Sequence, residues 1–159
     1  MRWLPAILWV VMLLLIFYFS SQAGSPENSA KWIREFLAQF SPTLAERLTD
    51  AQLSAINYTL RKAGHGVGYL ILTLLGYGAF HVSFGMERTR ALRWAIVTSL
   101  IRAVIDEIHQ AFVPGRTGTI IDVGIDAIGI AIGALLIRRK SGGVITKYSG
   151  RSHSSLRSE

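Results

Sequence analysis

Apolar positions along the chain gather into four long segments, and polar stretches separate them. The first segment has no charged residue from Trp3 to Phe19, and the other three hold 21, 20 and 19 residues. A helix that crosses the hydrocarbon core of a bilayer needs about 20 residues, within a range of about 17 to 25. The pattern predicts an all-α membrane protein, an antiparallel bundle of four transmembrane helices at about residues 3–19, 64–84, 94–113 and 119–137.

The stretch between the first two predicted spans carries helix signals of its own. Ser25-Pro26-Glu27 is typical of a helix start, and Ser41-Pro42 repeats the signal. Apolar residues at helical spacing follow both, and residues 53–60 are expected to form a third short helix before the second span. We therefore expect amphipathic helices over about residues 25–60 that lie on the outer membrane surface or cap the bundle, although plain connecting helices fit as well.

Basic residues predict the orientation, because cytoplasmic loops carry an excess of Lys and Arg. They precede the first span, crowd the second connection and follow the fourth span, at Arg2, at Arg88, Arg90 and Arg93, and at Arg138, Arg139 and Lys140. Both termini are therefore expected in the cytoplasm, and residues 20–62 and 114–118 outside. The end of the first segment is a poor signal-peptide cleavage site, so we expect that segment to remain as a span.

Composition supports this class and excludes several others. Half of the residues are hydrophobic, and the mean hydropathy is positive. The absence of Cys excludes disulfides and thiolate chemistry. The net charge is +7, but six Lys and Arg lie in the last 22 residues, so residues 141–159 are expected to be a flexible basic tail near anionic lipid. We expect the lipid bilayer as a partner and no nucleic acid, because the tail is no folded platform.

Ionisable residues inside the predicted spans are the most unusual feature of the chain. Each costs roughly 2.5 kcal/mol or more near a bilayer centre, so they usually face protein or a wet cavity. The predicted orientation brings those of three spans to the same outer leaflet. Helical spacing also puts them on shared faces. The sets are Arg102, Asp106 and His109; Lys62, His65 and Tyr69; and Asp122, Asp126, Gly129 and Gly133, where the glycines allow close helix approach.

Local structure offers a plainer explanation for several of these residues. Arg102 and Asp106 fit an ion pair within one helix. Thr119 and Asp122 fit a capping box, and Tyr69 fits an aromatic residue at the membrane interface. Pairing cannot account for all of them, because Asp106, Glu107, Asp122 and Asp126 are four acids against one buried Arg.

The connection between the third and fourth predicted spans is a second candidate element. Residues 114–119 read Pro-Gly-Arg-Thr-Gly-Thr and precede a helix N-terminus. Free backbone N–H groups, the positive end of a helix dipole and Arg116 make an anion site there plausible. A tight turn between helices is the equally good alternative.

Three motifs link the chain to known proteins. They are Ser20-Ser21-Gln22, Lys62-x-x-His65-x-x-x-Tyr69-x-x-Leu72 and Asp106-Glu107-x-His109-Gln110-x-Phe112-x-Pro114-Gly115-Arg116-x5-Asp122. Through them the chain resembles the VanZ-like family of small bacterial membrane proteins over roughly residues 5–138. Two positions depart from the family pattern, since Asp126 stands where Asn is usual and Gly68 where an acid often precedes the Tyr. The resemblance implies the bacterial cytoplasmic membrane, the cell envelope and a link to resistance to the glycopeptide antibiotic teicoplanin, but no reaction.

The leading functional hypothesis is an outward-facing polar pocket that binds an anionic or lipid-linked envelope component, such as a cell-wall intermediate. Arg61, Lys62 and Arg116 would contact the anion. The remaining ligand-binding candidates are His65, Tyr69, Asp106, Glu107, His109, Gln110, Asp122 and Asp126.

Two other classes of function stay open. One is a membrane-embedded hydrolase or phosphatase acting on a lipid-linked substrate, with His109, Asp106, Glu107 and His65 as catalytic candidates. No HExxH or comparable ligand spacing is present, so we expect no metal and no cofactor. The other is a structural or partner-binding subunit in which the polar residues only set helix registry. Four short helices without an inverted repeat argue against proton-coupled transport.

Overall fold

The computed structural model describes residues 1–149, without the side chains of Gln22 and of residues 141–149. Those residues are helical throughout apart from short connections, which confirms the all-α prediction. The long helices are α1 (Leu4–Ser20), α2 (Pro26–Phe40), α4 (Asp50–Gly78), α5 (Arg88–Ala111) and α6 (Ile120–Ser149), and the short elements are η1 (Gln22–Gly24), α3 (Pro42–Arg47) and the π-helical turn η2 (Ala79–Ser83).

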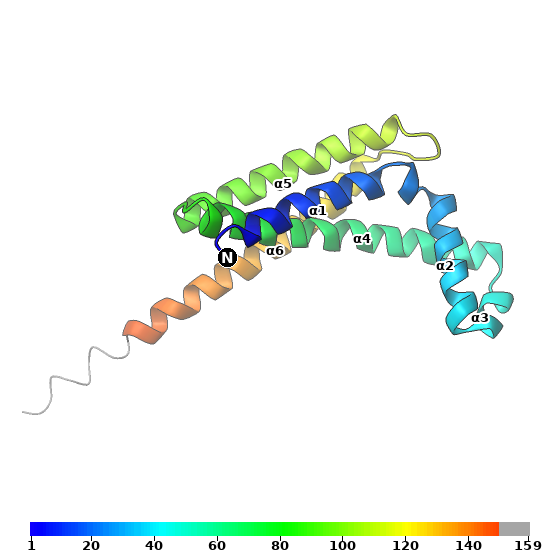
Figure 1. Ribbon diagram of the computed structural model, residues 1–159, viewed down its shortest axis with the longest axis horizontal. Coiled ribbons are helices and arrows are strands. Elements are labelled where there is room, and N and C mark those ends of the chain that lie inside the picture. The colour runs from blue at the N-terminus through cyan, green and yellow to red at the C-terminus, as the bar shows by residue number, and fades with distance from the viewer. Residues whose placement is uncertain (150–159) are drawn as a thin grey trace, which may run out of the picture.

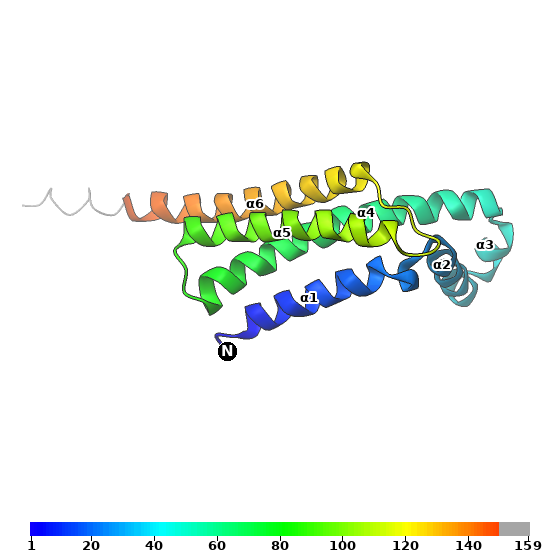
Figure 2. The same ribbon diagram turned by 90° about the horizontal axis from the view of Figure 1, so that it is seen from above.

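Helices α1, α4, α5 and α6 run side by side as a bundle, and α2 and α3 lie across one end of it (Figure 1; Figure 2). Helix α4 is the centre of this arrangement, because it packs against α1, α2, α5 and α6. Its core contacts include Tyr69 and Leu72, which pack with Ala103 of α5 and Ile130 of α6. The α4 helix thus connects the bundle to the α2–α3 end.

Two of the helices are long and apolar enough to cross a membrane, at Asp50–Ser83 and Ile120–Lys140. Helix α1 is also apolar but has only 17 residues. Helix α5 contains the third predicted span. Its composition differs from that of Asp50–Ser83 and Ile120–Lys140 because it carries charges at Arg102, Asp106 and Glu107. The four-span topology and its orientation remain predictions.

Two helix boundaries differ from those expected. Residues 53–60 do not form a separate short helix, because α4 starts at Asp50 and continues past them. A capping box starts it: Gln52 N–H donates to Thr49 Oγ1 at 3.3 Å, and Thr49 N–H donates to Gln52 Oε1 at 3.0 Å. Its 29 residues give about 44 Å, more than the roughly 30 Å hydrocarbon core.

The last helix also runs further than its apolar pattern indicates. Helix α6 continues to Ser149 rather than ending near Ile137, so the first part of the expected flexible tail is helical. Residues 150–159 of that tail lie outside the described residues.

The outer segment folds against α4. Ser25 caps α2 as predicted, since its hydroxyl accepts from Asn28 N–H at 3.3 Å. Two long-range contacts then hold α2 to α4. Arg34 Nη2 lies 2.7 Å from Asp50 Oδ1, and the Asn57 side chain donates to Pro26 O at 2.8 Å.

Hydrogen bonds hold α1 near its start. Ser83 Oγ of η2 donates to Arg2 O at 2.9 Å, and Arg2 Nε donates to Ser83 O at 3.0 Å. The chain just before α1 is therefore tied to the end of α4 through η2.

Glycines bring α4 and α6 into backbone contact. A Cβ at Gly129 would lie 2.0 Å from the carbonyl oxygen of Gly66, and one at Gly133 would lie 3.1 Å from that of Leu70. The stripe that begins with Asp122 and Asp126 therefore faces α4, which confirms that it turns toward a neighbouring helix.

Candidate functional site

Two of the four acids have strong partners nearby. Asp106 is 2% exposed; its Oδ1 lies 3.0 Å from Arg102 Nη1, and its Oδ2 accepts from Gln110 Nε2 at 3.0 Å. Asp122 pairs with Lys62 of α4. Both acids therefore have a neutralising cation, and the expected ion pair within α5 is present.

The capping box at the start of α6 is present as well. Asp122 N–H donates to Thr119 Oγ1 at 3.2 Å, and Thr119 Oγ1 donates to Asp122 Oδ2 at 3.0 Å. Lys62, expected to contact a bound anion, instead has the Asp122 carboxylate as its partner.

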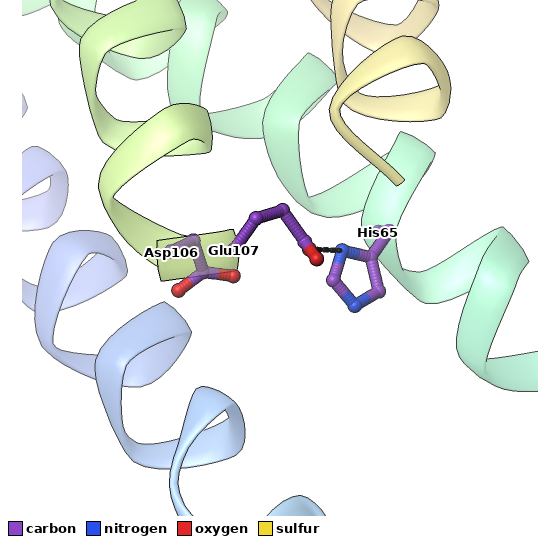
Figure 3. A group of neighbouring side chains, drawn as sticks. All are labelled: His65, Asp106 and Glu107. Carbon is purple, nitrogen blue, oxygen red and sulfur yellow. Dashed lines mark ion pairs between the residues drawn. The ribbon is translucent and has the colours of Figure 1, made fainter. Parts of the chain in front are cut away.

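The other two acids share one histidine. His65 Nδ1 lies 3.3 Å from Asp126 Oδ1 and 3.9 Å from Glu107 Oε1. Figure 3 shows the Glu107 carboxylate pointing at the imidazole, with the Asp106 carboxylate beside it. Three helices thus place Asp106, Glu107 and Asp126 around His65, which we call the His65 cluster.

The N-terminus of α6 already has an anion, and it comes from the chain itself. Thr119 N–H donates to Glu107 Oε2 at 2.7 Å. A Cβ at Gly118 would lie 2.1 Å from Glu107 O, so only glycine allows this approach. The helix dipole therefore stabilises the Glu107 carboxylate, and the amide of Thr119 is not left for an external anion.

Several polar atoms of the His65 cluster, and the hydroxyl of Tyr69, are buried and make no hydrogen bond within the described part of the chain. Asp126 is 0% exposed and Tyr69 is 1% exposed. A buried polar group without a partner costs about 1–3 kcal/mol, more if it is charged. The atoms are His65 Nδ1, Tyr69 OH, Asp106 Oδ1, Glu107 Oε1 and both carboxylate oxygens of Asp126.

Arg116 binds backbone oxygens at the end of α1. Its Nη1 donates to Phe19 O at 2.9 Å and also to Gly24 O. Gly115 precedes it with φ +74°, a conformation that favours glycine. The Pro-Gly-Arg turn therefore contacts the residues on both sides of the Ser20-Ser21-Gln22 motif, which sequence spacing could not reveal.

His109 does not join the His65 cluster. Its ring packs against Phe17 of α1 at 5.1 Å between centroids. Among the described residues, no hydrogen bond or ion pair connects it to the four acids. The structure therefore turns this predicted site residue toward α1 and away from the His65 cluster.

A cavity of about 800 Å³ lies between α1, α2, α3 and the first half of α4. Apolar side chains form most of its wall, among them Met12 and Ile16 of α1 and Trp32 and Phe36 of α2. Polar groups gather among its remaining lining residues: Asn57, Arg61, His65, Tyr69, Asp106, Gln110 and Arg116. We call this cavity the α1–α2 pocket; five of the predicted ligand-binding residues are not among those that line it, namely Lys62, Glu107, His109, Asp122 and Asp126.

Arg61 and Arg116 both line this pocket, and neither has a carboxylate at ion-pair distance among the described residues. Burial lowers the pKa of Arg116 below its ordinary value, and the charge of Arg61 lowers it further, while the acids around it oppose the change. Two neighbouring guanidinium groups favour an anion between or beside them.

The arrangement suits three kinds of chemistry. The apolar wall can hold a hydrocarbon chain, the guanidinium groups can hold an anion, and the His65 cluster can hold a cation or transfer a proton. Sequence reasoning missed the apolar wall that α2 supplies. The signal was there in the spacing of Trp32 and Phe36, one helical turn apart.

Comparison with known proteins identifies the family. The family model described as VanZ/LLP1 matches residues 4–141. No curated protein and no solved structure matches the chain. Because the match spans the bundle, the α1–α2 pocket and the His65 cluster, the chain belongs to the VanZ/LLP1 family.

Proposed function

We propose that this protein is a multi-pass protein of the bacterial cytoplasmic membrane that binds a lipid-linked anionic component of the cell envelope in the α1–α2 pocket. The observation that carries the proposal is that the pocket wall is mostly apolar and also includes two arginines, Arg61 and Arg116. The volume falls within the roughly 300–1,000 Å³ of small-molecule sites.

A four-span topology is supported by the side chains that the bundle leaves exposed. Helix α5, in spite of its charges, exposes Ile101, Val104, Ile105 and Ile108, while Asp106 and Glu107 are buried. The outward surface of α5 is thus compatible with lipid. With Arg88, Arg90 and Arg93 in the cytoplasm, the α2–α3 end and its pocket face outside.

The ligand follows from the two parts of the pocket. An acyl or isoprenoid chain fits between α1 and α2, and a phosphate head fits at Arg61 and Arg116. The resemblance to the VanZ-like family implies the cell envelope as the context and a link to teicoplanin resistance, and the proposal includes both.

The test measures lipid binding by the purified full-length protein in detergent. An isoprenoid monophosphate should bind, while an isoprenoid alcohol of the same chain length should bind about tenfold or more weakly, because it lacks the charge. Arg61→Gln should weaken binding of the phosphate by about the same factor without affecting the alcohol. Arg47→Gln, an exposed arginine of α3, is the matched control and should bind like the unaltered protein.

Equal binding of the phosphate and the alcohol would contradict an anion-binding end. Binding of neither lipid would overturn the proposed function altogether.

Hydrolysis of the head group is the second candidate function. It is favoured by one observation, that His65 and Asp106 lie in the wall of the pocket with Glu107 against the imidazole. Release of phosphate from the same lipid by the unaltered protein, and its loss in His65→Gln, would support it.

A further inference from the structure

We propose that His65, Asp106 and Glu107 hold a divalent cation of the Mg²⁺/Mn²⁺ class beside the α1–α2 pocket, whose wall includes His65 and Asp106. Helix α4 supplies the imidazole and α5 supplies both carboxylates (Figure 3). The inference goes beyond lipid binding and does not depend on it. It also revises the expectation of no metal, which rested on ligand spacing along single helices.

The three side chains have the separation that a common cation requires. One potential ligand atom from each lies within 4.8 Å of the other two. Ligand atoms at about 2.1 Å from one ion lie roughly 3 to 4.2 Å apart, so small side-chain rotations bring all three into range. Two carboxylates and one imidazole match the ligands found for Mn²⁺ and Mg²⁺ sites with remaining water positions.

The charges of the cluster also favour a dication. Lys62 neutralises Asp122, and Arg102 neutralises Asp106. Glu107 and Asp126 remain, and within the described residues His65 is the only basic side chain at ion-pair distance from either. A divalent cation balances both carboxylates and leaves the imidazole neutral, the form that binds metal.

Buried atoms without partners give independent support. Asp126 is 0% exposed, and neither of its oxygens makes a hydrogen bond within the described part of the chain. The same holds for the hydroxyl of Tyr69, a residue 1% exposed that interacts electrostatically with Asp106 and Asp126. A proton on His65 would give Asp126 one hydrogen-bond partner. It would leave Glu107 Oε1 and the Tyr69 hydroxyl without a hydrogen bond. A cation with its bound water serves them together.

The place of the site connects it to the pocket. His65 and Asp106 are both part of the pocket wall, so coordination positions not used by the protein face the cavity. An oxygen of an anionic ligand could reach the cation there, with Arg61 on the same wall. Asp126 Oδ1 lies 3.3 Å from the same His65 Nδ1 that faces Glu107, so Asp126 adds a further negative charge beside the cation.

The experiment measures Mn²⁺ binding by the full-length protein in detergent, without lipid and after removal of metals with a chelator. Loss of the free Mn²⁺ signal in electron paramagnetic resonance should indicate one tight ion per chain. Glu107→Gln keeps an oxygen for Thr119 N–H but removes the charge, and we expect its Kd to rise about tenfold or more. Glu46→Gln, an exposed acid of α3, is the matched control and should leave the Kd unchanged.

His65→Gln is the second variant and should raise the Kd by a similar factor. Helical circular dichroism and the elution volume of each variant verify that it is folded. No saturable binding by the unaltered protein, or equal Kd values for Glu107→Gln and Glu46→Gln, would overturn the site.

Lipid binding in the presence of the chelator separates the two proposals. Mn²⁺ binding without lipid binding supports the cation site and overturns the proposed function. Lipid binding by a protein that takes up no Mn²⁺ supports the proposed function and overturns the cation site.

Discussion

The two sides of α4 are built in opposite ways. Toward α6, Gly66 and Gly129 put the two backbones in contact, and Lys62 and His65 reach the acids of α6. Toward α1 and α2, the same helix borders an 800 Å³ cavity with apolar walls. One helix thus packs closely against a neighbour on one side and borders a cavity on the other. The side of α4 toward α6, which we call the closed side, holds His65 in place. The side toward α1 and α2, which we call the open side, gives His65 access to the pocket.

The closed side should be the more sensitive to a single added carbon. Gly129→Ala places a Cβ 2.0 Å from Gly66 O, where neither backbone can yield. We expect a loss of about 3 kcal/mol in stability, the upper end for overpacking, visible as a lower melting temperature of the purified protein. Gly124→Ala in the same helix has nothing within 4 Å and should be neutral or stabilising. Equal melting temperatures for the two variants would show that the α4–α6 contact is not tight.

The ion pair across the closed side should come next. Lys62→Met leaves the buried Asp122 carboxylate without its cation, and Lys62 is itself 23% exposed, so part of the cost is relieved by solvent. We expect about 2 kcal/mol of destabilisation, below the roughly 3–5 kcal/mol of fully buried pairs. Adding Asp122→Asn to Lys62→Met should recover part of it, and thermal unfolding of the single and double variants measures this. If the single and the double variant have the same lowered melting temperature, the charge interaction between Lys62 and Asp122 does not contribute to stability.

The open side should show the smallest effect on stability. Phe36 is part of the pocket wall yet is 61% exposed, so Phe36→Ala removes few packing contacts. We expect a change below about 1 kcal/mol in stability, with weaker binding of the isoprenoid lipid. Leu72→Ala, at a fully buried position of α4, should cost about 2–5 kcal/mol and serves as the comparison. A Phe36 variant that melts as low as the Leu72 variant would mean that the α1–α2 pocket is part of the core.

Sequence patterns predicted the features that depend on neighbours along the chain. Capping at Ser25 and Thr119, the Arg102–Asp106 pair and the shared faces of α4 and α6 are all set within one or two turns, where helical geometry is regular. The same reasoning correctly expected Asp122 and Asp126 to turn toward another helix.

Features that depend on how helices dock were beyond that reasoning. The contact of Arg116 with Gly24 joins positions 92 residues apart, and Glu107 meets Thr119 only because of how the α5–α6 turn folds back. The unbroken length of α4 was also missed, because Gly64, Gly66 and Gly68 after two basic residues resemble the end of a helix. Packing against α6 favours Gly66, whose carbonyl oxygen lies against Gly129.

Helix α1 is held by hydrogen bonds at both of its ends. At one end Arg2 and Ser83 exchange hydrogen bonds, and at the other Arg116 holds the carbonyl oxygen of Phe19. Between these two sets of hydrogen bonds, the cavity is bordered by Met12, Leu15 and Ile16. This wall of the cavity therefore combines a helix backbone held at both ends with side chains that can rotate.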